Sequence, residues 1–518
     1  MKKVLLSFVA FSLSLNVIQA ESVEVTSTAM DASVEGTLPY VIANAPAGST
    51  VDFNFDGTEL VCSEETAIEI NKSLIFNGIN KKNNQKVTIK GAGSLFNIKN
   101  AAEVQLKDLI VSDFKKIAII VGGASSVQVE NCLFKDNKDA KATGGNNGGV
   151  MRVSSSKVIL KNSIFTGNSG NGGYGGGAVC VYGASDLRAE NCTFTANSAA
   201  VGGAALSVKA TGTKGELLPP KAYIANCTFA NNIADLRGAL YLVSECTHAE
   251  KFSPVVVNCT FVGNLAEKEG AAVCLWSKAS TSLNVTMVNN LFAENYITPW
   301  NDNSGEKCDV WAFYLAGEVN NVNEPLPQTV YQDCVNNLYE AAKPGFFDNK
   351  NTVIDFSKVV VFKDVEQNPL DLGDEFYTHK TSKLHGNLMV AMIAENSVAK
   401  NAGTKTYKTV EIPVTDQLGK TRPATPSVGA VEFGDVIDGL GMVTSAGNIQ
   451  VIASGKELRI SGIENQSQVQ VYDLTGALVW TGIVENNEVI NLSSVAMGIY
   501  GVQVVNGMEK TTAKVIIR

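Results

Sequence analysis

A nine-residue segment recurs six times between residues 129 and 295, and its spacing constrains the fold more than any other feature of the chain. Two well-matched copies read AENCTFTAN from Ala189 and IANCTFANN from Ile224. Successive copies lie 29 to 35 residues apart, measured at their first Asn, which stands at Asn131, Asn162, Asn191, Asn226, Asn258 and Asn289. A period of this length is typical of solenoids, in which each repeat packs against its neighbours.

Each copy shows the alternation of a β-strand. In AENCTFTAN, Cys192 and Phe194 fall on one face, and Thr193 between them is expected to face outward. The inward parity changes at the preceding Asn, which predicts a bend there in the left-handed backbone region that Asn tolerates. Stacked Asn side chains can hydrogen-bond along such a column. The closing Asn of each copy, such as Asn197, is expected to mark the next turn.

A second element, Gly and a small residue before a further strand, follows the copies, as in GGVMRV from Gly148 and GGAVCV from Gly176. Each period then holds about three short strands and three turns. This predicts an all-β chain whose main part is a right-handed parallel β-helix with three-strand rungs. A β-propeller is the rival fold, but its blades need about 40 residues and four antiparallel strands. Residues 36–47 have apolar residues at helical spacing and predict a helical cap over the first rung.

The composition excludes several kinds of partner and class. The chain has 42 Lys and Arg against 51 Asp and Glu, a net charge of -9, and no basic stripe, so we expect no nucleic-acid partner. An apolar content of 45% with 18% charged residues argues against a disordered chain. After the N-terminus no segment reaches the roughly 18 apolar residues of a membrane helix, so we expect no transmembrane segment.

The N-terminus predicts an exported protein. Residues 1–20 carry Lys2 and Lys3, then an apolar run, and end at Ala20, which is the layout of a secretory signal peptide. Ten cysteines in an exported chain would suit disulfides. However, four of them share one repeat position, which favours buried free thiols in the core: Cys132, Cys192, Cys227 and Cys259. Strand spacing still leaves disulfides along this stack as an alternative.

Residues from about 30 to 433 resemble a known family at both ends of the repeat. The opening GTLPYVIANAPAGSTVDF, the NCTFxxN rungs and the closing VTDQLGKTRPATPSVGAVEF resemble the pectin-lyase-like β-helix proteins of bacterial surfaces, including those with polymorphic outer-membrane-protein-like repeats. The closing motif stands here at Asp416, Gly419, Arg422, Pro423, Gly429, Ala430 and Glu432. The resemblance covers about residues 30 to 433 and implies a fold and a cell-surface location, without an activity.

After Phe433 the repeat stops, and residues 437–518 carry antiparallel strand and turn signals, including a hairpin turn at Asn506. They predict a small β-sandwich after the 21–436 β-helix. The tail resembles the C-terminal sorting domain of the type IX secretion system of Bacteroidota, with motif residues Tyr472, Asp473, Gly476, Gly498, Tyr500, Lys514 and Arg518. This resemblance implies handling by that machinery, export across the outer membrane, removal of the tail and attachment to surface lipopolysaccharide. A generic small β-sandwich binding module is the alternative.

Catalytic candidates are few. Aligning the rungs at their closing Asn places Ala200, Asp235 and Glu267 in one column and Gly202, Arg237 and Glu269 in the next, so we take Asp235, Arg237, Glu267 and Glu269 as candidates for carboxylate chemistry on a saccharide. A surface ion pair between Arg237 and Glu269 is the plainer interpretation. The three His residues lack metal-ligand spacing, so we expect no metal and no cofactor, with Ca²⁺ needed only by a lyase.

Insertions that interrupt the period, notably residues 296–350, are the other candidate sites. They suggest ligand-binding aromatics at Trp300, Trp311 and Tyr314, with Trp276 from a rung strand, although each of these can also pack beneath its own loop. We expect a non-catalytic adhesin or a protein that binds glycans or host ligands. The alternatives are a lyase or glycosidase on an acidic polysaccharide, which the negative net charge disfavours, and a structural surface-layer role.

Overall fold

The computed structural model describes residues 21–518 apart from short segments, namely 63–66, 140–146, 171–174, 212–220, 246–250, 279–281, 298–305, 317–321, 326–329, 331, 344–349, 357, 364, 370–377, 383, 386, 435–449, 455, 462, 464–465, 474–476, 487, 497, 507–508 and 518. The predicted signal peptide therefore lies outside the described residues. Within the described part, no helix combines the length and apolarity needed to cross a bilayer.

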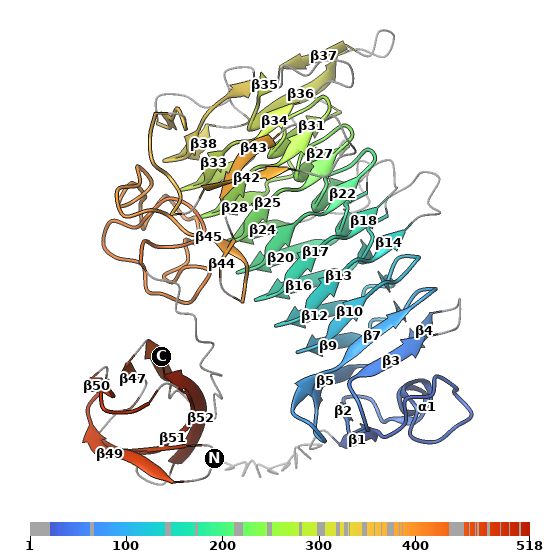
Figure 1. The fold of residues 1–518 in the computed structure, drawn as a ribbon. Coiled ribbons are helices and arrows are strands. Elements are labelled where there is room, and N and C mark those ends of the chain that lie inside the picture. Colours follow the sequence, from blue (N-terminus) through green and yellow to red (C-terminus); the bar gives the residue numbers. More distant parts are fainter. Residues whose placement is uncertain are drawn as a thin grey trace, which may run out of the picture.

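Residues up to about 353 wind into a parallel β-helix, whose equivalent strands stack rung upon rung (Figure 1). Sheet A contains β1 (Ser22–Val25), β2 (Thr50–Phe53), β5 (Leu74–Asn80), β6 (Gln85–Lys86), β9 (Glu103–Lys107), β12 (Ser126–Glu130), β16 (Lys157–Lys161), β20 (Asp186–Glu190), β24 (Ala222–Ala225), β28 (Val255–Val257), β32 (Thr286–Val288) and β38 (Asp333–Val335). Sheet B contains β3 (Glu59–Cys62), β7 (Thr88–Gly91), β10 (Ile110–Ser112), β13 (Leu133–Lys135), β17 (Ile164–Thr166), β21 (Thr193–Thr195), β25 (Thr228–Ala230), β29 (Thr260–Val262), β33 (Leu291–Ala293), β39 (Leu338–Tyr339) and β41 (Thr352–Val353).

Two further sheets complete the rungs. Sheet C contains β4 (Ile68–Ile70), β8 (Phe96–Ile98), β11 (Ile119–Val121), β15 (Met151–Ser154), β19 (Val179–Gly183), β23 (Leu206–Ala210), β27 (Leu240–Ser244), β31 (Val273–Ser277), β36 (Val310–Ala316), β37 (Val322–Pro325) and β40 (Ala342–Lys343). Sheet D, a narrow sheet of two-residue strands, contains β14 (Lys138–Asp139), β18 (Ser169–Gly170), β22 (Ser198–Ala199), β26 (Ile233–Ala234), β30 (Leu265–Ala266), β34 (Tyr296–Ile297) and β35 (Glu306–Lys307).

Sheet D corrects the prediction of three strands per rung. From β14 onward the residues just after each closing Asn form a fourth, short strand. Two residues are too few to show an apolar alternation, so the pattern could not reveal them. The parallel β-helix itself is confirmed. Its predicted cap is α1 (Leu38–Asn44), which buries Leu38, Val41 and Ile42 and begins after Thr37, whose hydroxyl accepts a hydrogen bond from the Tyr40 amide.

The core of the β-helix contains a column of Phe side chains stacked in register. Six Phe rings stack with centroids 4.7 to 5.0 Å apart, from Phe134 through Phe165, Phe194, Phe229 and Phe261 to Phe292. Beside them, Cys192, Cys227 and Cys259 are fully buried. The nine cysteines in the described part of the chain are all buried thiols. Desolvation raises the pKa of the Cys132 thiol to about 12, so this position is unreactive.

The predicted Asn bends are confirmed. The first Asn of every copy has a positive φ of 47 to 57°, from Asn131 to Asn289. Its side-chain ladder is partial: Asn226 donates to Asn191 at 3.2 Å and Asn191 to Asn162 at 3.1 Å, while Asn289 separately donates to Asn258 at 3.0 Å.

The closing Asn residues form the more complete ladder. Each side-chain Nδ2 donates to the Oδ1 of the next at 2.9 to 3.0 Å, through Asn137, Asn168, Asn197, Asn232, Asn264 and Asn295. Each backbone N–H donates to that same Oδ1 at 3.0 to 3.1 Å. All six side chains are buried, so this column satisfies the backbone polar groups of the turn inside the protein.

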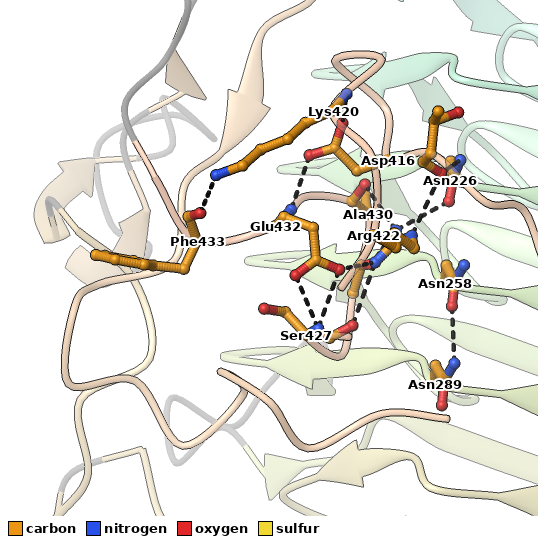
Figure 2. A network of polar contacts seen from close by, with 12 residues as sticks. Asn226, Asn258, Asn289, Asp416, Lys420, Arg422, Ser427, Ala430, Glu432 and Phe433 are labelled. Atoms are coloured by element: carbon orange, nitrogen blue, oxygen red, sulfur yellow. Dashed lines mark hydrogen bonds and ion pairs between the residues drawn. The ribbon is translucent and has the colours of Figure 1, made fainter. Parts of the chain in front are cut away.

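The chain then turns back along its own surface. The hairpin of β42 (Val365–Pro369) and β43 (Thr378–Ser382) comes first and is followed by β44 (Leu384–His385). Residues 388–433, which include β45 (Val390–Ala391), the partner of β44, form what we call the strap. The strap covers the outer face of sheet B and the column formed by the first Asn of each copy. Figure 2 shows this column beside Arg422. Thr193 faces outward from sheet B as expected, but the strap covers it: its hydroxyl donates to the Leu388 carbonyl and accepts from Gln417, and the side chain is buried.

Arg422 anchors the strap. Its guanidinium is 1% exposed and donates to the Glu432 carboxylate at 2.7 Å and to Asn226 Oδ1 at 3.0 Å, and to four backbone carbonyl groups (Figure 2). Glu432 in turn accepts from the Ser427 amide. The closing sequence motif is therefore a buried polar fastening.

The tail folds around a core of its own. One antiparallel sheet contains β46 (Gln450–Ser454), β47 (Glu457–Ser461) and β50 (Val489–Asn491), and the other contains β49 (Leu478–Val484), β48 (Ser467–Tyr472), β51 (Gly498–Asn506) and β52 (Glu509–Ile517) in that order. Val469, Val471 and Val502 are among the residues buried between them. The predicted small antiparallel domain is confirmed.

Candidate functional site

The outward face of sheet C carries Trp276 and Trp311, and Arg237 and Glu269 border it. Residues such as Val179, Val181 and Leu206 point into the main core, so their neighbours along each strand point outward. Parallel register aligns one outward row through Arg152, Cys180, Ser207, Tyr241, Cys274 and Trp311. A second row contains Val243 and Trp276.

The aromatic candidates lie at the C-terminal end of this face. Tyr241, Val243, Cys274 and Trp276 form a cluster against which the half-buried Trp311 packs. Trp276 is only 6% exposed, so its ring stabilises this cluster and offers little surface to a ligand. Tyr314 belongs to β36, opposite Ser277, and Trp300 lies outside the described residues.

The charged candidates border this cluster. The Arg237 guanidinium binds the Glu269 carboxylate at 2.9 Å and stands 5.0 Å from the centroid of the Tyr241 ring. Both side chains are mostly buried, at 17% and 14% exposure. Their rung partner is Gly203 and not the predicted Gly202, because this rung has one more residue after its closing Asn than the later rungs.

Asp235 and Glu267 occupy adjacent rungs just after sheet D, as aligned. The Asp235 amide donates to Ala199 and the Glu267 amide to Ala234. Burial, and then the charge of Glu267, raise the pKa of Asp235. The structure thus arranges the four charged candidates as two pairs. Arg237 and Glu269 form an ion pair, whereas Asp235 and Glu267 are two carboxylates that repel each other.

A groove at the N-terminal end of the same face was not predicted from the sequence. It has a volume of about 250 Å³ and is lined by Ser94, Lys116, Ile117, Ile120, Asp139, Asn147 and Arg152. Ile120 of β11 and Arg152 of β15 lie side by side in register. The available signal was the Arg at an outward position where later rungs carry Cys180, Ser207 or Tyr241.

A buried polar cluster closes the far end of the Asn ladder. Asp309 accepts a hydrogen bond from Asn295 at 2.8 Å and from the Glu340 and Ala341 amides. Lys307 is paired with Glu340. Within the described residues no group of His, Cys, Asp and Glu side chains is arranged to hold a metal ion. Because Asp309 ends the Asn ladder and accepts from these backbone amides, we assign the cluster a structural role.

The cluster makes stability depend on pH. Desolvation, with the charge of Glu340 adding to it, raises the pKa of Asp309 from 3.8 to about 7. Between about pH 4 and 7 the folded state then binds more protons than the unfolded chain, so the free energy of unfolding should fall as pH rises through this window. Urea unfolding from pH 4.5 to 8 should show this slope in the wild type and a smaller slope in Asp309→Asn. Equal slopes in the two proteins would contradict the assignment.

In the tail, the sorting-motif residues occupy strands and turns of one sheet. Tyr472 ends β48, Gly498 and Tyr500 lie in β51, and Lys514 pairs with Gly501 from β52. Tyr500 is buried and its hydroxyl donates to the Ala496 carbonyl at 2.8 Å. Asp473 accepts from the Ala477 amide across the turn, while Gly476 and Arg518 lie outside the described residues.

Comparison with known proteins finds two matches along the chain. Residues 94–292 match the family model described as right handed beta helix region. Residues 449–518 match the model described as secretion system C-terminal sorting domain. No curated protein matches the chain. The right-handed β-helix and the sorting tail predicted from the sequence are both confirmed.

Proposed function

Taking the chain as a right-handed β-helix protein with a type IX sorting domain, we propose that it is a non-catalytic, surface-attached protein that binds a saccharide through the outer face of sheet C. The sorting domain indicates handling by the type IX machinery and export across the outer membrane to the surface or medium. Removal of the tail and attachment to lipopolysaccharide belong to the proposal.

The groove at Arg152 is the observation that carries this proposal. Its volume of about 250 Å³ lies below the range of sites for drug-sized ligands and suits one unit of a polymer. Ile117 and Ile120 supply an apolar wall for the face of a sugar ring, and Arg152 supplies a planar donor for a carboxylate or sulfate. Asp139 lines the same groove and can accept from a sugar hydroxyl.

The outward row of sheet C runs from Arg152 to Trp311 over six consecutive rungs, and the four residues between these ends are fully buried, namely Cys180, Ser207, Tyr241 and Cys274. A ligand on this face would therefore contact the groove at Arg152 or the end of the row at Trp311. We keep Trp311 as the proposed ligand contact on this face. Trp300 and Tyr314 remain proposed contacts of the insertion, and Tyr314 is aligned with Ser277 and not with the outward row. Trp276 enters the proposal as the residue that packs beneath Trp311.

A binding assay with acidic oligosaccharides tests the groove. Arg152→Ala in the chain of residues 21–518 should raise the dissociation constant for uronate or sulfate saccharides on a glycan array at least tenfold, because the anion loses its charged donor. Arg152→Lys should lose less, since the charge remains while the fork geometry is lost. Arg459→Ala, on β47 of the tail, is the matched control. Undiminished binding by Arg152→Ala would refute the groove as the site.

One observation favours an enzyme as the second candidate. A carboxyl group with a raised pKa next to another carboxylate is the arrangement of a general acid with its partner, and Asp235 beside Glu267 has it. A digestion screen run with and without Ca²⁺ separates the two functions. New reducing ends or unsaturated products that disappear in Asp235→Ala or Glu267→Ala would favour the enzyme, and binding without turnover favours the adhesin.

A further inference from the structure

The edge strand of the tail's four-stranded sheet exposes apolar side chains. In β49, Leu478 is 48% exposed, Val479 38% and Ile483 69%. Within the described residues no other strand exposes more than one large apolar side chain to this degree. An exposed apolar patch of this kind marks an interaction site or an aggregation hazard.

The adjacent strand β48 carries polar side chains on the exposed face of this sheet. β48 pairs with β49 in antiparallel register, with Gln468 opposite Ile483 and Gln470 opposite Thr481. Val469 and Val471 of β48 point into the core and the two Gln side chains point away from it, as expected for a sheet with one solvated face. Val479 and Ile483 share that outward side and depart from the pattern.

β49 also has a free edge. In the sheet order β49-β48-β51-β52 it pairs on one side only, within the described residues. Its sequence, LVWTGIV, has no charge and no Pro, which are the usual means of protecting an edge strand from pairing. An uncharged edge with apolar side chains is a template for another extended strand.

We propose that β49 is a docking edge to which the secretion machinery adds an extended strand of its own during export. The match of residues 449–518 to a sorting domain argues for this occupant, because the machinery must recognise a feature of this domain. Main-chain hydrogen bonds along β49 would give affinity, and Val479 and Ile483 would give the contact its specificity. A second copy of the chain is the competing occupant.

Export of the full-length chain tests this edge. In the native secretion host, the double variant Val479→Thr, Ile483→Thr keeps β-branched residues while removing apolar surface, and Ile483→Lys adds an edge charge. We expect the amount of each variant at the cell surface to be at least tenfold lower than that of the wild type, with the variant protein accumulating in the periplasm. Val489→Thr, a 41% exposed residue on β50 of the other sheet, is the matched control and should be exported like the wild type.

The outcomes separate recognition from misfolding and from self-association. Because the substituted sites are exposed, denaturant midpoints of the purified variants should equal that of the wild type. Variants that fold normally and reach the surface at wild-type levels would overturn the proposal. So would a wild-type dimer in size-exclusion chromatography that the double variant converts to monomer without loss of export, because β49 would then serve a second copy.

Discussion

Replacing Arg422 with Ala is expected to lower the free energy of unfolding by about 3 to 5 kcal/mol, the cost of breaking a buried ion pair from one side. The guanidinium is 1% exposed and pairs with Glu432, which is itself 4% exposed. Removing it leaves that carboxylate buried without its counter-charge. It also leaves Asn226 Oδ1 and the carbonyl groups of the strap without their donor. Guanidinium-induced unfolding of the chain of residues 21–518 measures the loss.

Three comparisons make this result specific. Lys90→Ala removes the exposed pair with Glu59 and should cost less than about 1 kcal/mol. The double variant Arg422→Met, Glu432→Leu removes both charges and should recover much of the loss, because well-packed apolar groups replace such pairs at little cost. Limited proteolysis of Arg422→Ala should cut first within residues 388–433. A loss as small as that of Lys90→Ala would show that the strap is held by its apolar contacts.

The repeat could be predicted from the sequence because each rung contacts mainly its neighbouring rungs. Stacked Phe194 and Phe229, and the left-handed Asn191 and Asn226, follow from a local pattern that recurs at one period. The cap at Leu38 follows from local helical spacing in the same way. Local patterns of this kind are what sequence reasoning can resolve.

What the sequence could not predict depends on contacts between distant residues. Thr193 alternates like an outward residue, and only the return of Gln417 to the same site buries it. The groove likewise joins Ser94 to Arg152 from different rungs, so no single stretch of sequence contains it. Trp276 has the large aromatic side chain expected of a ligand contact, but it is buried because it packs in one cluster with Tyr241 of the rung before. Periodicity specifies the scaffold, whereas long-range packing determines its surface.

In the ladder of closing Asn residues, Asn232→Ala should lower the free energy of unfolding by about 3 to 5 kcal/mol. Each buried polar group left without a partner costs about 1 to 3 kcal/mol. Asn232 Oδ1 accepts from both the backbone N–H and the Nδ2 of Asn197, and its own Nδ2 donates to Asn264 and to the Phe194 carbonyl. Ala leaves the two Asn197 donors without their acceptor and the Phe194 carbonyl without this donor, whereas Asn264 Oδ1 still accepts from the backbone N–H of residue 232. The column is fully buried, so water does not replace the lost partners.

The matched control lies in the other Asn column. Asn191 is half-buried with a φ of 54°, a conformation that Gly adopts freely, so Asn191→Gly should cost less than about 1 kcal/mol. Asn232→Asp should keep both acceptor bonds and lose the donors while burying a charge. Burial raises the pKa of the new carboxyl in the folded protein, so the loss in the free energy of unfolding should grow as pH rises from the unfolded-state pKa to the folded-state pKa. Denaturant unfolding of the three variants at two pH values checks this order. Similar losses in Asn232→Ala and Asn191→Gly would mean that the buried hydrogen bonds of Asn232 contribute no more stability than those of the half-buried Asn191. A larger loss at Asn232 would instead show that its side-chain hydrogen bonds hold successive rungs together.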